Sequence, residues 1–217
     1  MTAPAGTVVH EQAKTVIERL APLYPDPHTA LNWSDPIELM VAVILSAQCT
    51  DERVNQVTTE LFRKYKGAAE YAAADPKTFE SEIKPTGFFR NKAKNIIGAC
   101  TVIAQEHEGR VPDTIEEMVA LPGIGRKSAN IILAEAHGEL TGIPVDTHVK
   151  RLTKRLGLTE KTDPDKIEAE LMPAIPSEEW YRFSSELIFH GRAVCTARKP
   201  SCEDCVLNDI CPSAFSC

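Results

Sequence analysis

Four cysteines near the C-terminus form the densest group of potential ligands in this chain of 217 residues. Cys195, Cys202, Cys205 and Cys211 follow the spacing C-x6-C-x2-C-x5-C. Four thiolates this close together can hold a cubane iron–sulfur cluster, which takes four cysteine ligands. Zinc is the main alternative, although its sites usually come as two ligand pairs separated by a longer finger. The odd cysteine count, 7, argues against a framework of disulfides. We predict one [4Fe-4S] cluster on these cysteines.

A second chemical signal lies in the segment PDTIEEMVALPGIGRKSANIILAEAHG, residues 112–138. Thr114 and Glu117 predict a capping box at the start of one helix, and Leu121-Pro122 ends that helix. Gly123-Ile124-Gly125 predicts a tight turn into a second helix. Backbone N–H groups beside glycines at a helix N-terminus can bind a phosphate, because they have no partner inside the helix and the helix dipole favours an anion there. An ordinary helical hairpin would explain the glycines equally well.

The charges that follow this turn favour a functional interpretation. Arg126 and Lys127 begin the second helix, where the dipole disfavours cations. A residue placed against its local electrostatic preference is more often kept for function than for stability. The net charge of −7 argues against nucleic acid only weakly, because binding depends on the local patch.

These motifs resemble the endonuclease III family of DNA glycosylases. The resemblance rests on LPGIGRKSAN, on the following VDTHVKR, and on the four-cysteine array. It extends through LSAQCTD at 45–51, TGFFRNKA at 86–93 and HGRAVCTARKPSC at 190–202. The family motifs therefore occur in order along most of the chain.

The resemblance implies two catalytic residues. Lys127 would be the nucleophile that attacks C1′ of a damaged nucleotide, expels the base and forms a Schiff base with the opened sugar. The helix N-terminus, Arg126 and bound DNA each disfavour a charged ammonium, which would activate the amine. Asp146 would be the acidic partner, and it is also a favourable N-cap for the helix that follows it.

The other implied positions contact DNA. Gln48 would fill the gap left by an extruded base, and Phe88 or Phe89 would enter the base stack, although one of these phenylalanines could instead anchor its loop in the core. The remaining predicted DNA contacts are Gly123, Gly125, Arg126, His148, Arg151 and Arg192. Cys49, Cys100 and Cys217 lie outside the array and are interpreted as ordinary thiols.

The elements that must position these residues are predicted to be helical. Asp35-Pro36 is an N-cap followed by a first-turn proline, and it precedes an apolar helix too short to cross a membrane. No pair of alternating apolar runs flanks a hairpin turn, so we expect an all-α protein. The other expected helices cover residues 9–20, 52–65, 92–107, 114–120, 127–137, 148–156, 165–172 and 177–190.

The family architecture implies two helical lobes that flank a DNA-binding cleft. Residues 29–139 would form a six-helix lobe with the helix-hairpin-helix, and residues 1–28 and 140–217 an iron–sulfur cluster lobe. We expect a bifunctional enzyme that excises oxidised pyrimidines from duplex DNA and cleaves the abasic site by β-elimination. With no signal peptide apparent, we expect a monomer in a prokaryotic cytoplasm, associated with the nucleoid and not with a membrane. The alternatives are a mismatch-type glycosylase for adenine or thymine and a non-enzymatic iron–sulfur DNA-binding protein.

Overall fold

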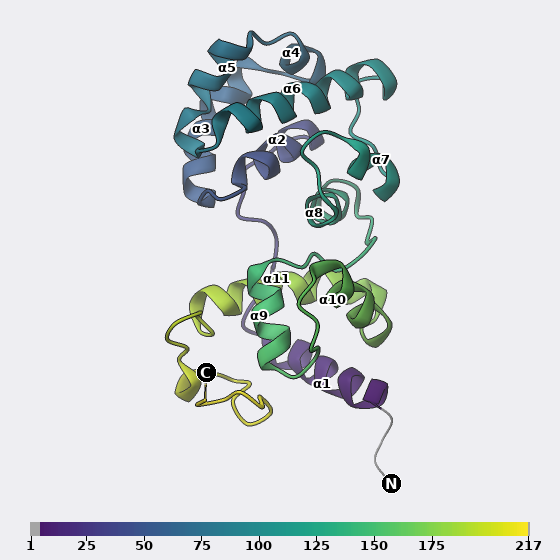
Figure 1. The fold of residues 1–217 in the computed structure, drawn as a ribbon, viewed down its shortest axis with the longest axis vertical. Helices are drawn as coiled ribbons and strands as arrows, with labels where there is room; N and C mark the ends of the chain where they lie inside the picture. Colours follow the sequence, from purple (N-terminus) through teal and green to yellow (C-terminus); the bar gives the residue numbers. More distant parts are fainter. Residues whose placement is uncertain (1–4, 217) are drawn as a thin grey trace. The chain divides into compact units, whose positions relative to one another are not determined.

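The computed structural model describes residues 5–216, and these residues are helical with no β-strand. They divide into two compact units (Figure 1). The middle unit comprises Thr29–Glu139, and the terminal unit combines residues 5–28 with residues 140–216. The prediction of an all-α fold is confirmed. Among the described residues, no helix is both long and apolar enough to cross a membrane.

The middle unit holds seven α-helices around one hydrophobic core. They are α2 (Pro36–Ser46), α3 (Asp51–Lys64), α4 (Ala68–Ala72), α5 (Pro76–Glu82), α6 (Phe89–Glu106), α7 (Ile115–Ala120) and α8 (Arg126–His137), with a 3-10 turn η1 (Lys84–Thr86) before α6. The buried helix α2 packs against α3, α6 and α8, and α6 also packs against α4 and α5. Figure 1 shows α6 as the longest helix of this unit, lying between α2 and the short helices α4 and α5.

The caps of these helices follow the sequence signals in most places. The Asp35 carboxylate accepts the backbone N–H groups of Ile37 and Glu38, at 2.8 and 3.0 Å, as expected for an N-cap. Helix α6 begins three residues before the expected start, at Phe89. Its N-cap, Phe88, is in the left-handed conformation and offers no side-chain hydrogen bond, so the usual polar cap signal is missing from the sequence.

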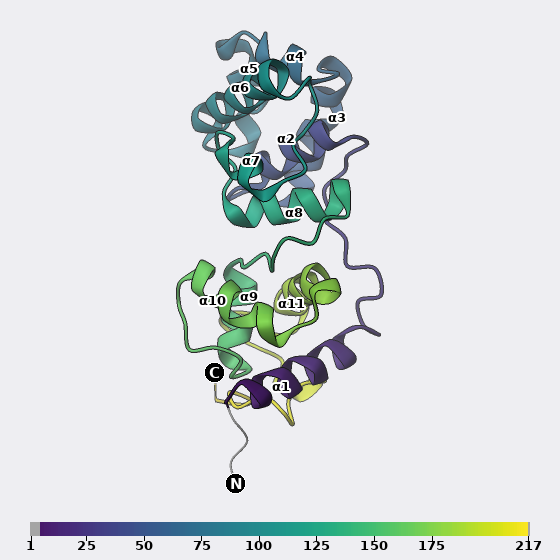
Figure 2. The same ribbon diagram turned by 90° about the vertical axis from the view of Figure 1, so that its right-hand side faces the viewer.

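The terminal unit holds α1 (Ala5–Leu20), α9 (Thr147–Arg155), α10 (Pro164–Leu171) and α11 (Trp180–Ala193). Three 3-10 turns, η2 (Met172–Ala174), η3 (Ser177–Glu179) and η4 (Cys202–Asp204), complete it. Helix α11 packs against α9 and α1 over a second hydrophobic core (Figure 2). The N-terminal helix and the C-terminal segment therefore belong to one folded unit, although they lie at opposite ends of the chain. Cys217 lies outside the described residues.

Candidate active site

The turn between α7 and α8 is shaped by Gly123. This residue has φ +80°, and a Cβ atom there would lie 2.6 Å from the Asn95 side chain of α6. Ile124 is only 5% exposed and anchors the turn in the core of the middle unit. Pro122 packs near Gly98, again on α6. Helix α6 therefore packs directly against the turn. Position 123 needs glycine, because its backbone is left-handed and there is no room for a Cβ atom.

The start of α8 is an exposed helix N-terminus that carries a cationic side chain. Gly125 is the N-cap of α8, and no side chain caps the helix there. Gly125, Arg126 and Lys127 are exposed, and the first turn contains no acidic residue. Within residues 5–216, Lys127 has no hydrogen-bond or ion-pair partner. An uncapped, exposed helix N-terminus is suited to bind a phosphate, and an unpaired lysine beside it remains available to react.

Asp146 is the N-cap of α9, as expected. Its Oδ1 atom accepts the backbone N–H groups of His148, at 2.7 Å, and Val149, at 2.8 Å. Both bonds use the same oxygen, and the described residues provide no hydrogen bond to Oδ2. The cap thus fixes the carboxylate through one oxygen and leaves the other for a ligand or a proton. Capping and acid–base chemistry can coexist in this geometry.

The side chains beyond Asp146 join α9 to α11. The Arg151 Nη2 atom donates to the carbonyl oxygens of Gly191, at 3.0 Å, and Cys195, at 2.9 Å, and lies 3.1 Å from His148 Nδ1. Burial lowers the pKa of His148, Arg151 and Arg192 lower it further, and Asp146 opposes these effects. The guanidinium of Arg151 is therefore engaged inside the terminal unit. A DNA contact by Arg151 stays a prediction, as does one by the exposed Arg192.

Two loops of the middle unit expose residues with left-handed backbones. Gln48 has φ +53° in the turn between α2 and α3, and Phe88 has φ +47° before α6. Phe88 is 63% exposed, whereas Phe89 packs partly against the hydrophobic core. The left-handed region is costly for a bulky residue, so each loop is held in shape by its surroundings. Of the two phenylalanines, Phe88 is the one available to touch a ligand.

The four cysteines of the C-terminal array line one small pocket, together with Arg155, Pro200 and Asn208. Burial raises the pKa of the Cys205 thiol, and the other three thiols each raise it further, which reflects how close the four sulfur atoms lie. Arg155 Nη1 donates to Cys195 Sγ at 3.2 Å, and His190 Nε2 lies 3.3 Å from Cys205 Sγ. Within the described residues, no three of the His, Cys, Asp or Glu side chains converge tightly enough to bind one metal ion. Four thiols around a shared pocket, one of which accepts a hydrogen bond from Arg155, fit a group that carries negative charge on sulfur.

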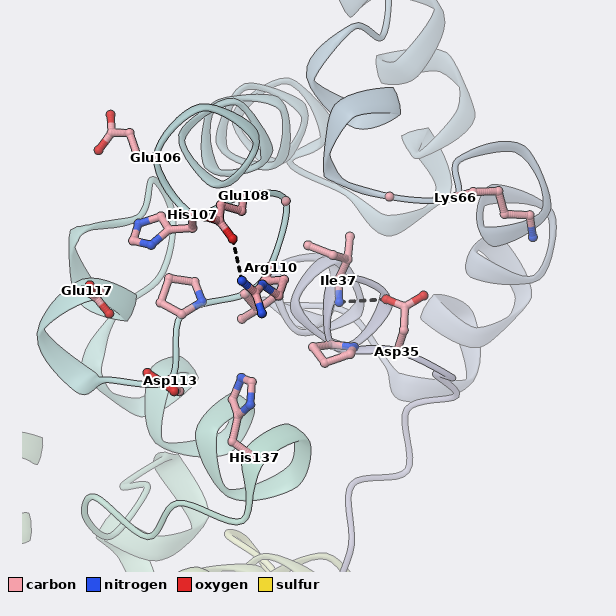
Figure 3. Close-up of a pocket in the computed structure, with 15 residues that line it drawn as sticks. Asp35, Ile37, Lys66, Glu106, His107, Glu108, Arg110, Asp113, Glu117 and His137 are labelled. Atoms are coloured by element: carbon pink, nitrogen blue, oxygen red, sulfur yellow. Dashed lines mark hydrogen bonds and ion pairs between the residues drawn. The ribbon is translucent and has the colours of Figure 1, made fainter.

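A separate hollow in the middle unit contains none of the predicted site residues (Figure 3). It lies where Ile37 of α2 and the N-cap residue Asp35 approach the segment from Glu106 to Asp113, with His137 at its edge. Three of its charged groups already have partners, because Asp35 caps α2 and Glu108 pairs with Arg110 at 2.5 Å. The groups suited to chemistry lie instead on the hairpin, the two loops, α9 and the cysteine segment.

Comparison with known proteins assigns the chain to a family. Residues 41–177 match the HhH-GPD superfamily of base excision DNA repair proteins, and residues 195–211 match the iron–sulfur binding domain of endonuclease III. The endonuclease III of Synechocystis sp. is 53% identical over 94% of this chain and 93% of the relative. The chain belongs to the endonuclease III family. The Bacillus subtilis enzyme is 42% identical over 93% of this chain and 92% of its own length.

Solved structures agree with this membership. A non-covalent endonuclease III–DNA complex superposes with a TM-score of 0.90 at 40% identity, covering 94% of this chain and 96% of that one. A trapped covalent endonuclease III–DNA intermediate gives the same TM-score, 0.90. A thermostable thymine-DNA glycosylase, at 21% identity and a TM-score of 0.84, shares the fold. The chain is therefore a DNA glycosylase and lyase of base excision repair, and it carries an iron–sulfur binding domain at residues 195–211.

Proposed function

We propose that this enzyme excises oxidised pyrimidines from duplex DNA and then cleaves the resulting abasic site by β-elimination. The observation that carries the proposal is Lys127, an exposed lysine without a partner among the described residues, in the first turn of an uncapped helix. The dipole disfavours a cation at that position. A lysine kept there is better explained by reactivity than by stability. The solved complexes of endonuclease III with DNA support duplex DNA as the partner.

The reaction follows from an amine attacking a sugar carbon. The Lys127 nitrogen forms a bond to C1′, the glycosidic bond breaks, and the base leaves with its electron pair and a proton. Ring opening gives an imine between Lys127 and the sugar. Loss of a proton from C2′ then expels the 3′-phosphate and cleaves the strand. Asp146, held through Oδ1 and with Oδ2 unengaged by the described residues, serves as the acidic partner that stabilises positive charge or transfers protons.

We further propose how the damaged base is reached. A pyrimidine with a saturated or fragmented ring stacks poorly, so its extrusion costs less than that of an intact base. Phe88 enters the base stack and Gln48 fills the vacated space, and both are exposed on fixed loops. Gly123, Gly125 and Arg126 hold the backbone phosphates near the extruded nucleotide.

For the terminal unit we propose a [4Fe-4S] cluster bound by Cys195, Cys202, Cys205 and Cys211. The pocket that these thiols share supports this assignment. The cluster would fix a loop whose exposed Arg198 and Lys199 contact phosphates. In this scheme the middle unit is the helix-hairpin-helix lobe, the terminal unit is the cluster lobe, and the protein works as a monomer in a bacterium.

A side-by-side excision assay tests the substrate class. Duplexes containing thymine glycol or dihydrouracil should be cut, whereas 8-oxoguanine paired with cytosine, and adenine paired with 8-oxoguanine, should be cut poorly. A clear preference for the purine substrates would overturn the proposed substrate class and leave the fold and the family unchanged.

A further inference from the structure

One lysine of the middle unit is buried and has no carboxylate partner. Lys92, on α6, is 4% exposed, and the described residues contain no ion pair to it. Its ammonium group donates to two backbone carbonyl oxygens, those of Leu45 at 2.8 Å and Thr86 at 2.7 Å. Burial lowers the pKa of Lys92, because the charged form loses hydration. A buried ammonium satisfied only by carbonyl groups is costly, and an apolar side chain of similar size would avoid that cost.

The two carbonyl groups belong to the two loops that carry Gln48 and Phe88. Leu45 is the penultimate residue of α2, three positions before Gln48. Thr86 ends η1, two positions before Phe88. Both anchor residues are themselves buried, at 0% and 2% exposure. The ammonium of Lys92 therefore fastens the bases of both loops to one point.

Lys92 also makes a hydrogen bond on the C-terminal side of the turn at Gly87-Phe88. Its backbone N–H donates to the Phe88 carbonyl at 3.1 Å, while its side chain holds Thr86. Between these bonds lie Gly87, with φ +70°, and Phe88, with φ +47°. Two successive residues with positive φ are unfavourable outside glycine, so the contacts on either side must maintain them.

We infer that Lys92 is a positioning residue for nucleotide extrusion, which sets the spacing between Gln48 and Phe88 by tying both loops to one buried ammonium. The inference rests on the proposed roles of these two residues in opening the duplex. Lys92 touches neither the DNA nor the reacting atoms. Its contribution is to hold two exposed side chains at a fixed separation, so that one enters the stack while the other fills the gap.

A pair of substrates separates this role from a general loss of structure. An abasic site in duplex DNA must be extruded before Lys127 can reach it, whereas the same site in a flexible single strand need not be. Lys92→Met should slow β-elimination on the duplex by roughly 10²-fold, the scale expected when a reacting group is misplaced by about 1 Å. The rate on the single strand should stay at the wild-type value. Lys77→Met, at an exposed position of α5, is the matched control and should leave both rates unchanged.

Further variants distinguish the positioning of Gln48 and Phe88 from a purely structural role in which Lys92 only caps the C-terminal end of α2. Lys92→Arg keeps the charge and several donors and should recover most of the duplex rate. Adding Lys92→Met to Phe88→Ala should cost much less than Lys92→Met alone, because residues that act through one another are not additive. If Lys92→Met does not fold, the milder Lys92→Gln gives the same comparison, because its shorter side chain loses the charge and cannot hold both carbonyls.

The outcomes are distinct. A selective loss on the duplex supports the inference, whereas equal losses on both substrates, or no loss in a folded variant, overturn it. Both substrates carry an abasic site and not an oxidised base. A wild-type enzyme that cleaves them but ignores thymine glycol would therefore refute the substrate class alone and leave the role of Lys92 to be decided by the duplex-to-single-strand ratio.

Discussion

Replacing Gly123 by alanine tests whether the hairpin turn has the geometry described above. At φ +80° an alanine has an unfavourable left-handed backbone, which destabilises the fold by about 1–2 kcal/mol. Its Cβ would also lie 2.6 Å from the Asn95 side chain. Relieving such overpacking costs about 1–3 kcal/mol in a well-packed region. The two contributions together predict a loss of about 2–5 kcal/mol in the free energy of unfolding.

Gly138→Ala provides the matched control. Gly138 follows α8 with φ +72°, and nothing lies within 4 Å of the position where its Cβ would be. Gly138→Ala should therefore lose only the backbone contribution, about 1–2 kcal/mol, in the free energy of unfolding. Chemical denaturation of both variants isolates the Asn95 contact as their difference. Binding to a duplex with a stable abasic-site analogue should weaken for Gly123→Ala and stay unchanged for Gly138→Ala.

A second-site change sharpens the test. Asn95→Gly removes the atoms that crowd position 123, at a cost of about 1 kcal/mol for a glycine inside a helix. In the Gly123→Ala background, Asn95→Gly should recover the part of the unfolding free energy that was lost to the Asn95 contact. The part lost to the left-handed backbone should remain. If Gly123→Ala is no more destabilising than Gly138→Ala, the close approach of α6 to the turn is refuted.

Three further predictions concern the proposed chemistry, the cluster and DNA binding. Asp146→Asn keeps the capping oxygen, so this variant should fold normally while excision slows by about 10²-fold or more. Asp146→Ala should also lose about 1 kcal/mol in the free energy of unfolding, because the cap is removed. An Asp146→Asn variant with the wild-type rate would show that Asp146 has no acid–base role. Cys202→Ser should lose iron, measured by metal analysis and visible absorption, and should destabilise the terminal unit. Full retention of iron would show that Cys202 is not a ligand. DNA affinity should fall with salt at a log–log slope of about −0.9 per neutralised phosphate, and a flat response would show that the exposed basic residues do not contact the backbone.

Local signals in the sequence predicted much of the fold. The N-cap roles of Asp35 and Asp146 are confirmed, because a carboxylate that caps its own helix depends only on residues two or three positions away. The short helices α4 and α5 were not expected. Asp75-Pro76, an N-cap followed by a first-turn proline, was a usable signal for α5. Helix α4 is five residues long and has no side-chain cap, so its sequence carries little helical signal of its own.

The parts of the site that the sequence left open depend on contacts between distant residues. Phe88 and Phe89 have identical side chains, yet Phe88 has a left-handed backbone and is 63% exposed, whereas Phe89 packs partly against the core. Lys92 looks like one member of a basic surface cluster, yet its ammonium lies against a carbonyl 47 residues away. Arg151 likewise reaches carbonyl groups 40 and 44 residues away. Tertiary packing of this kind has no local periodicity or cap to reveal it.

Borohydride trapping tests the central claim, that Lys127 is the covalent nucleophile. Wild-type enzyme on a duplex containing thymine glycol or an abasic site should give a stable protein–DNA adduct after reduction. Lys127→Gln should bind the same duplex and give no adduct, whereas the neighbouring control Arg126→Gln should bind more weakly and still be trapped. Normal trapping by folded Lys127→Gln would contradict the account, because the reacting amine would then have to lie elsewhere in the chain.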